Sequence, residues 1–238
     1  MVEKLQLIHE GKAKKVFSTT NPHQLLLEFK DDATAFDGQK KGRIREKGAL
    51  NLAISALLFE YLEKENIPTH FIKKISSTEM LVKAVKIIPV EFVVRNWTAG
   101  SLARRMGIEE GIKLKKTILE FYYKNDELKD PMINEYHIEA FNLAEKKHIE
   151  KVKEYSLAVN DALLRLFESI GIILADFKLE FGVDNNGEVI LADEISPDSC
   201  RLWDAETMEK LDKDRFRRDL GRIEEAYREV LKRLEARR

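Results

Sequence analysis

Cysteine is almost absent from this chain of 238 residues, which contains only Cys200. A single thiol excludes an internal disulfide and every metal site that needs several cysteines. The sequence has no apolar run approaching the length of a membrane span, and Met1–Glu10 lacks the pattern of a signal peptide. We therefore expect no membrane partner and a soluble, cytoplasmic protein.

Net charge is also small, because 41 Lys and Arg residues nearly balance 42 Asp and Glu residues, to give −1. This balance gives the whole molecule no field that would attract nucleic acid, so any anion site must be local. The five histidines are not spaced as metal ligands on a helix face, and the sequence contains neither a Gly-x-Ser-x-Gly elbow nor a Walker loop. These absences disfavour zinc and serine hydrolase chemistry. A hydrophobic content of 44% argues against disorder and suits one large core or two modest ones.

The most informative stretch is Ile172–Arg201. Apolar runs on either side of Asn186-Gly187 predict two antiparallel strands joined as a hairpin. Side chains alternate between the faces of a strand, so the first strand should have one charged face and one apolar face. The charged face consists of Asp176, Lys178 and Glu180, and the apolar face of Phe177, Leu179 and Phe181.

The loop of this hairpin decides where two carboxylates meet. With a two-residue turn, Glu180 lies directly across from Asp193. A four-residue loop keeps both on one face, whereas a three-residue loop with a bulge puts them on opposite faces. Facing carboxylates repel unless a cation lies between them, and two hard oxygen donors suit Mg²⁺. We expect magnesium at Glu180 and Asp193; the alternative is a solvated face with scattered charges.

A glycine followed by lysines lies near the start of the chain, between strands predicted at Leu5–His9 and Gln24–Phe29. Gly11, Lys12 and Lys14 could cover a phosphate from this turn, but a solvated basic turn is the simpler interpretation of the motif by itself.

A second hairpin is predicted from Phe71–Ile75 and Glu79–Val85, and the sequence leaves open whether Lys83 within it points to phosphates or to water. The apolar segment Ile87–Arg95 should then cross between two lobes. Because proline cannot donate a ladder hydrogen bond, Pro89 predicts an edge or a hinge rather than a central strand.

The next segment, Asn96–Arg105, has a glycine and a serine before a predicted helix. Exposed backbone N–H groups, the Ser101 hydroxyl and a nearby arginine would together bind a phosphate. An ordinary N-cap by Ser101 is the alternative.

Three amphipathic helices are predicted from apolar side chains at helical spacing: Glu46–Glu65, Lys146–Ser169 and about Asp214–Arg237. Strands and packing helices in this order favour an α+β fold with two lobes. The residues alone indicate a magnesium–nucleotide enzyme that transfers a phosphoryl group. A small-molecule kinase, another ligase and a non-catalytic nucleotide-binding module remain alternatives.

Three long segments also match, in order, the signature segments of one known family. They are Ile87–Arg95 continuing into Thr98–Ser101, Leu174–Gly182, and Asp193–Ser199 with Arg201. The order of Gly11–Lys14 and Lys124–Asp126 fits as well. On these residues the whole chain resembles SAICAR synthetase, the phosphoribosylaminoimidazole-succinocarboxamide synthase of purine biosynthesis.

The resemblance implies an ATP-grasp-like architecture with antiparallel sheets and packing helices. It implies a nucleotide-covering lobe at residues 1–86 and a lobe with the metal and ribonucleotide sites at residues 87–238. The implied reaction joins L-aspartate to carboxyaminoimidazole ribonucleotide (CAIR) with ATP and Mg²⁺, through an acyl phosphate, to give SAICAR, ADP and phosphate. Members of the family often form homodimers.

The resemblance also implies roles for individual residues. The nucleotide would be bound by Gly11, Lys12, Lys14, Lys83 and Lys124, with Val85 and Ile87 lining the adenine pocket. The ribonucleotide phosphate would be bound by Arg95, Ser101 and Arg201, and magnesium by Glu180 and Asp193. Asp176 and Lys178 would orient the reacting groups, and Asp176 is our candidate acceptor of the aspartate amine proton.

Overall fold

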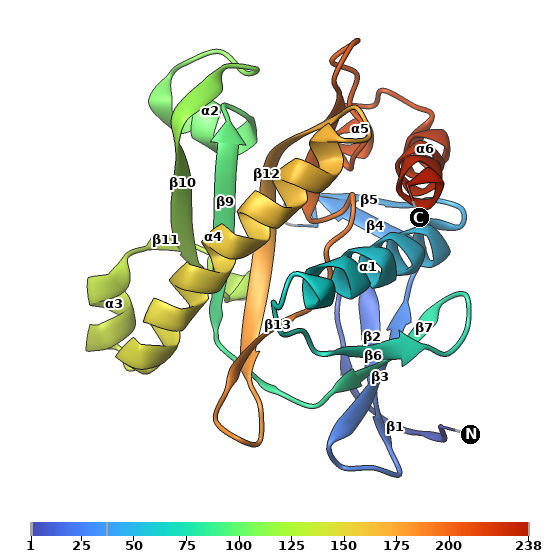
Figure 1. Cartoon of the computed structure of the whole chain (residues 1–238), viewed down its shortest axis with the longest axis vertical. Coiled ribbons are helices and arrows are strands. Elements are labelled where there is room, and N and C mark those ends of the chain that lie inside the picture. The colour runs from blue at the N-terminus through green and yellow to red at the C-terminus, as the bar shows by residue number, and fades with distance from the viewer. Residues whose placement is uncertain (1, 37, 238) are drawn as a thin grey trace.

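The N-terminal part of the chain forms a five-stranded antiparallel sheet in a computed structural model that describes residues 2–36 and 38–237 (Figure 1). Its strand order is β1 (Lys4–Glu10), β2 (Lys14–Thr19), β3 (Gln24–Phe29), β7 (Glu79–Lys83) and β6 (Phe71–Lys74). The first turn, between β1 and β2, contains Gly11. The helix α1 (Lys47–Lys64) packs against β3 and β6 and buries the apolar stripe predicted from the sequence.

The second sheet has seven strands and is built around β12. Its main path runs β11 (Met132–Ile133), β10 (Lys113–Tyr123), β9 (Val90–Trp97), β12 (Ile172–Val183) and β13 (Val189–Ala192). Two further strands, β8 (Lys86–Ile87) and β14 (Cys200–Asp204), also pair with β12. The long helix α4 (Lys146–Glu168) crosses one face of this sheet (Figure 1).

Shorter elements connect these parts. They are the ribbon of β4 (Asp32–Ala35) and β5 (Lys40–Arg43), α2 (Gly100–Met106), the 3₁₀ turn η1 (Asp126–Leu128) and α3 (Glu135–Ala140).

One apolar cluster runs through both sheets and their helices. Phe92 on β9 meets Phe121 and Phe181 edge to face, at centroid distances of 5.5 and 5.7 Å, which is a favourable geometry for aromatic pairs. The first sheet takes its strands from residues 4–83 and the second from residues 86–204. The division into two lobes at residue 86 stays a prediction. Among the described helices, none combines the length and the apolar character needed to cross a bilayer.

Two predictions of secondary structure are wrong. The strand that follows Pro89 is not an edge, because β9 pairs with β10 on one side and β12 on the other. Pro89 itself lies just before the strand, so its missing N–H removes no ladder bond. The final helix is broken into α5 (Asp214–Arg217) and α6 (Ile223–Ala236), and the break contains Gly221 and Arg222 in left-handed backbone conformations.

Candidate active site

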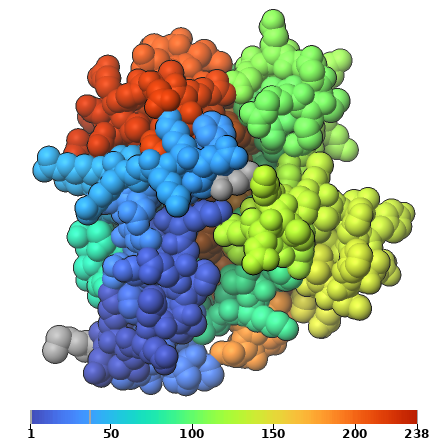
Figure 2. All heavy atoms as spheres, turned by 180° about the vertical axis from the view of Figure 1, so that it is seen from behind, coloured from blue at the N-terminus to red at the C-terminus, as the bar shows by residue number. Residues whose placement is uncertain are grey.

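A cavity of about 860 Å³ lies between the two sheets, and every site residue predicted from the sequence lines it. Seen from behind, the N-terminal strands on one side and the segments after β9 on the other border a hollow (Figure 2). The site therefore draws its side chains from segments far apart in the chain.

The hairpin at the centre of the site has a different register from the one expected. Glu180 pairs with Ala192 rather than Asp193, because Asp184 and Glu188 pair through the backbone and leave a three-residue loop. In a regular strand this register would turn Asp193 to the opposite face from Glu180. However, β13 ends at Ala192, and Asp193 has a left-handed backbone with φ of 62°.

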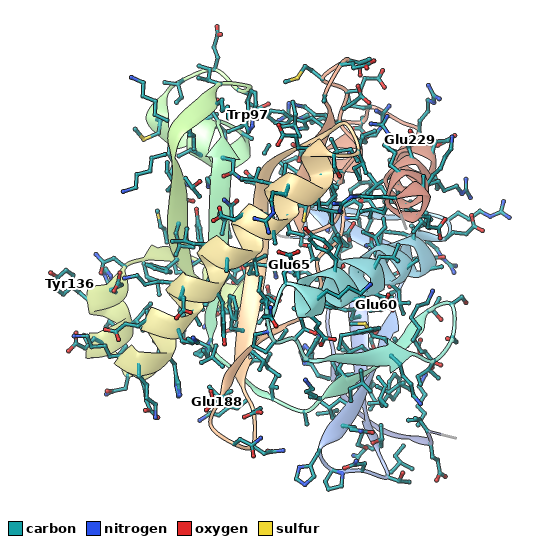
Figure 3. The ribbon with its side chains drawn as sticks, viewed as in Figure 1. Glu60, Glu65, Trp97, Tyr136, Glu188 and Glu229 are labelled. Carbon is teal, nitrogen blue, oxygen red and sulfur yellow. The ribbon has the colours of Figure 1, made fainter. Side chains whose placement is uncertain are left out.

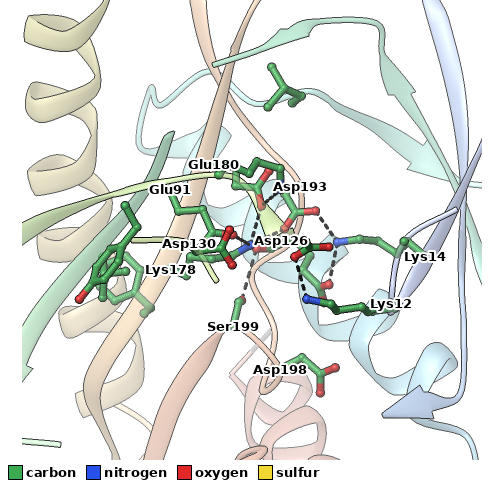
Figure 4. A pocket seen from close by; sticks show the side chains of 18 of the residues that line it. Lys12, Lys14, Glu91, Asp126, Asp130, Lys178, Glu180, Asp193, Asp198 and Ser199 are labelled. Carbon is green, nitrogen blue, oxygen red and sulfur yellow. Dashed lines mark hydrogen bonds and ion pairs between the residues drawn. The ribbon is translucent and has the colours of Figure 1, made fainter. Parts of the chain in front are cut away.

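This local break in the strand brings the two carboxylates together. The Lys178 ammonium nitrogen lies 2.5 Å from Glu180 Oε1 and 3.5 Å from Asp193 Oδ2. A third carboxylate, that of Glu91 on β9, accepts a hydrogen bond from the same nitrogen at 3.0 Å. Figure 4 shows these acidic side chains converging on Lys178. The predicted charged face is confirmed, while Phe177, Leu179 and Phe181 are buried on the apolar side.

Two further lysines enter this cluster. Lys14 donates to Asp193 Oδ1 at 2.5 Å and to Glu194 Oε1 at 2.7 Å, and it comes from the N-terminal sheet (Figure 4). Lys124, directly after β10, donates to Glu180 Oε1 at 2.7 Å. Lysines from three separate segments thus surround the two predicted metal ligands.

The cluster shifts the titration of its members. Burial alone would raise the pKa of Asp193, but Lys14 and Lys178 lower it well below the ordinary range. Burial would lower the pKa of Lys178, but Glu180, Asp193 and Glu91 raise it well above the ordinary value. Burial raises the pKa of Glu91, and Lys178 only partly opposes this shift.

The donor set fits magnesium as a partial shell. No group of three or more His, Cys, Asp or Glu side chains in the described part of the chain is placed to hold a metal by itself. Glu180 and Asp193 nevertheless share a cation, the Lys178 ammonium, which shows that one positive centre can contact both. Mg²⁺ typically takes one or two protein carboxylates and completes its shell with phosphate oxygens and water.

The other end of the cavity is rich in arginine. Arg95 is buried and donates to Glu120 at 2.6 Å, to Asp176 at 2.7 Å and to Ser101 Oγ at 3.0 Å. Arg201 donates to both oxygens of Asp176, at 3.0 and 2.9 Å. Asp176 therefore accepts hydrogen bonds from two guanidinium groups. The four residues predicted for this region, which are Arg95, Ser101, Asp176 and Arg201, form one hydrogen-bonded group.

The helix that follows β9 does not begin as an ordinary capped helix. Its N-cap is Ala99, so the alternative interpretation of Ser101 as an ordinary N-cap is wrong. The Gly100 N–H instead donates to Glu110 Oε1 at 2.7 Å. Gly100 has φ of 52°, and a Cβ atom there would lie 2.4 Å from Arg201 Nη2. Glycine is therefore required both by the backbone and by the close approach of the guanidinium.

The predicted adenine side of the cavity is more apolar. Val85 and Ile87 line it, and Gly182 on β12 allows Val85 to approach, since a Cβ at Gly182 would lie 2.4 Å from Val85 Cγ2. The exposed Lys83 also lines the cavity, where its ammonium donates to the Thr69 carbonyl oxygen at 2.9 Å.

At the mouth of the cavity, Gly11 and Lys12 belong to the β1–β2 turn. Lys12 donates to Asp126 at 2.7 Å, which connects the turn with the segment after β10.

Comparison with known proteins gives one consistent family. The family profile described as SAICAR synthetase matches residues 7–234. The phosphoribosylaminoimidazole-succinocarboxamide synthase of Thermoanaerobacter sp. (strain X514) is 59% identical over 233 residues, which cover 98% of this chain and 99% of that protein. This chain belongs to the SAICAR synthetase family.

Solved structures agree on the fold. The crystal structure of the synthase from Ehrlichia chaffeensis is 49% identical, with a TM-score of 0.95, and the match covers 97% of this chain and 99% of the other. A SAICAR synthetase (Type-2) in complex with ADP is 50% identical, with a TM-score of 0.92 over 95% and 96% of the two chains. The fold is therefore the ATP-grasp-like fold of SAICAR synthetases, as the sequence predicted.

Several residues that line the cavity were not predicted as site residues from the sequence. Glu91 could have been, because strand alternation places it on the same face as Arg95. Asp198, Lys213 and Arg217 also line the cavity. Lys213 and Arg217 carried no signal, since Lys213 directly precedes, and Arg217 lies within, the segment predicted as one continuous amphipathic helix.

Proposed function

We propose that this protein joins L-aspartate to CAIR with Mg·ATP and releases SAICAR, ADP and phosphate. The observation that carries the proposal is the single cavity in which a pair of carboxylates ringed by lysines lies beside two arginines. The names of the full-length relatives and the ADP complex of one solved relative support the same reaction.

The chemistry explains why both halves of the cavity are needed. A carboxylate is a poor acyl donor because its oxide is a very poor leaving group. Transfer of the ATP γ-phosphoryl group to the CAIR carboxylate gives an acyl phosphate, and the aspartate amine then attacks the acyl carbon and expels inorganic phosphate. Phosphoryl transfer depends mainly on positioning and on neutralising charge.

The residues divide this work between them. Glu180 and Asp193 would hold Mg²⁺, which when bound supplies charge neutralisation at the phosphates. Lys178 points its ammonium at the same centre and would stabilise charge on the transferred group. The Gly11 turn and Lys83 would contact the nucleotide phosphates.

The arginine-rich end would bind the ribonucleotide phosphate through Arg95, Ser101 and Arg201. Two guanidinium groups suit the planar, bidentate geometry of phosphate contacts. Asp176 accepts hydrogen bonds from both arginines, and these contacts favour a role in orienting them. Its role as proton acceptor for the amine stays a prediction.

The test is phosphate release with ATP and Mg²⁺, adding aspartate and CAIR singly and together, with the product identified by mass. We expect SAICAR only when all are present. A kinase would phosphorylate its acceptor without aspartate, and a non-catalytic nucleotide-binding module would bind ATP without releasing phosphate. Either outcome would reject the proposal.

We also propose that the protein is a homodimer. Large apolar side chains are exposed around β11 and α3: Leu128, Met132, Tyr136 and Phe141. Tyr136 is 82% exposed and projects from the body of the molecule (Figure 3). Sedimentation equilibrium of the wild type and of Phe141→Asp tests this proposal, and a wild-type protein that stays monomeric at micromolar concentration would reject it.

A further inference from the structure

Each predicted magnesium ligand is bracketed by two ammonium groups. Asp193 lies 2.5 Å from the Lys14 nitrogen and 3.5 Å from that of Lys178. Glu180 lies 2.7 Å from the Lys124 nitrogen and 2.5 Å from that of Lys178. Both carboxylates therefore already have cationic partners, supplied by the protein.

The Lys14–Asp193 pair is largely buried, whereas in the other pair Glu180 is buried and Lys124 is 41% exposed. The side chains of Lys14, Asp193 and Glu180 are 14%, 19% and 4% exposed. Coulomb attraction is stronger where water is largely excluded, and removing one partner of such a pair leaves the other charge poorly compensated. A divalent cation that enters alone must compete with these ammonium groups for the same oxygens.

A nucleotide removes this obstacle, because its phosphate oxygens can accept the hydrogen bonds that the lysines give to the carboxylates. We propose that Lys14 and Lys124 are exchange cations, which move from Asp193 and Glu180 to the nucleotide phosphates as the metal binds. The inference rests on the proposed function, because it takes Glu180 and Asp193 as the metal ligands. It makes metal and nucleotide binding cooperative through two identified side chains.

Lys178 differs from the other two lysines because it contacts both Glu180 and Asp193 and also has a further partner. Glu91 accepts a hydrogen bond from its ammonium at 3.0 Å and is not one of the metal ligands. When Glu180 and Asp193 are engaged elsewhere, Glu91 still orients Lys178 toward the reacting centre. Lys14 also has a partner that is not a metal ligand, because it donates to Glu194 Oε1 at 2.7 Å, so its ammonium can turn from Asp193 to the phosphates while Glu194 still holds it. Lys124 donates to Glu180 alone among the carboxylates of the described residues.

The exchange has a measurable consequence for metal affinity without nucleotide. Replacing Lys14 by Met removes a competitor for Asp193, so Mn²⁺, used as a spectroscopic substitute for Mg²⁺, should bind the nucleotide-free protein more tightly. We expect a gain on the order of tenfold, within the range typical of coupled sites. Electron paramagnetic resonance of free Mn²⁺ measures it directly, without any turnover.

The same variant should bind nucleotide less cooperatively with metal. The affinity for a nonhydrolysable ATP analogue, measured by calorimetry in EDTA and in Mg²⁺, gives the factor by which metal tightens nucleotide binding. By thermodynamic linkage this factor is reciprocal, so it should fall in Lys14→Met by about the amount that metal-only affinity rises.

Lys83→Met is the matched control. Lys83 lines the same cavity, but its ammonium contacts the Thr69 carbonyl oxygen rather than a metal-site carboxylate. Its loss should leave Mn²⁺ affinity within about twofold of wild type, as expected for an exposed charge that is screened by solvent. Equal tightening in Lys83→Met and Lys14→Met would overturn the exchange and indicate a general charge effect.

Two more variants, Lys124→Met and Asp193→Asn, distinguish a failure of the exchange proposal from a failure of the proposed metal site. Lys124→Met removes the partner of Glu180 from a half-exposed position and should also tighten Mn²⁺ binding. If neither lysine variant tightens it while Asp193→Asn weakens it, the exchange is wrong and the metal site stands. If Asp193→Asn binds Mn²⁺ like the wild type, the metal site of the proposed function fails as well.

Discussion

The carboxylate of Asp193 lies 3.5 Å from the ammonium of Lys178 although the pairing of their two strands points Asp193 the other way. The left-handed backbone of Asp193, with φ of 62°, makes this contact possible. Outside glycine this conformation is uncommon, but aspartate tolerates it better than most residues. A locally strained residue thus corrects a hairpin register that would otherwise separate the two predicted metal ligands.

Asp193→Asn tests the metal site directly. Asparagine also tolerates the left-handed conformation, so the fold should be retained while the anionic ligand is lost. We expect the Mg²⁺ concentration needed for half-maximal activity to rise by at least about 100-fold, since loss of even an outer-shell partner typically costs 10- to 100-fold. A magnesium titration of the steady-state rate measures this, and an unaltered titration would count against the site.

Lys178→Met separates binding from chemistry. The nucleotide has several other cationic contacts in the proposed site, so ADP affinity should stay within a few-fold of wild type. Turnover should fall by at least about 100-fold, the cost typical of removing one group that stabilises transition-state charge. Calorimetry and phosphate release report the two quantities, and unchanged turnover would refute a role for Lys178 at the reacting centre.

The sequence predicted which residues line the cavity better than it predicted their geometry. The charged face of β12 followed from strand alternation, which holds wherever the opposite face is buried. The contact between Asp193 and Lys178 did not follow, because it depends on one backbone dihedral and on a loop whose hydrogen bonds are set by Asp184. Nor did the pairing of Asp176 with two arginines, which come from strands far apart in the sequence and meet only in the sheet.

Apolar spacing also failed to predict where the final helix is interrupted. The break between α5 and α6 falls within a stretch whose apolar spacing is helical, and Leu220 in that stripe is 48% exposed. Periodicity therefore predicted helix correctly but missed its interruption, which contains Gly221 at a positive φ of 65°.

Gly100→Ala should impair ribonucleotide binding through Arg201. An alanine Cβ would lie 2.4 Å from the Arg201 Nη2 atom, so the guanidinium must move. The positive φ adds strain of about 1–2 kcal/mol. We expect the KM for CAIR to rise while the KM for ATP stays close to the wild-type value.

Gly107→Ala, at the other end of α2, is the matched control for this prediction. Gly107 also has a positive φ, of 62°, but a Cβ there meets no atom within 4 Å. Gly107→Ala should lower the thermal stability by an amount similar to the backbone strain in Gly100→Ala, but it should leave the KM for CAIR unchanged. If both variants raised the KM for CAIR equally, the contact with Arg201 would not be the cause.

The stability of the protein in mild acid should depend on His70. Burial lowers its pKa to about 3 in the folded protein, against an ordinary value of 6.5, and its Nε2 atom has no hydrogen-bond partner among the residues that the structure describes. Below about pH 6.5 the unfolded chain binds a proton that the folded protein refuses, so the free energy of unfolding falls as the pH falls. Between pH 8 and pH 5 this amounts to about 2 kcal/mol.

His70→Gln removes the group that takes up this proton. The free energy of unfolding should therefore fall less between pH 8 and pH 5 than in the wild type, even if the variant is less stable at pH 8. For a chain of this size, about 2 kcal/mol corresponds to roughly 4–8 °C in Tm. The measurement is the difference in Tm between pH 8 and pH 5, compared among the wild type, His70→Gln and His23→Gln, where His23 is exposed. Of these two histidines only His70 is buried, so the same Tm difference in His70→Gln as in the wild type would show that His70 does not stay neutral in the folded protein at pH 5.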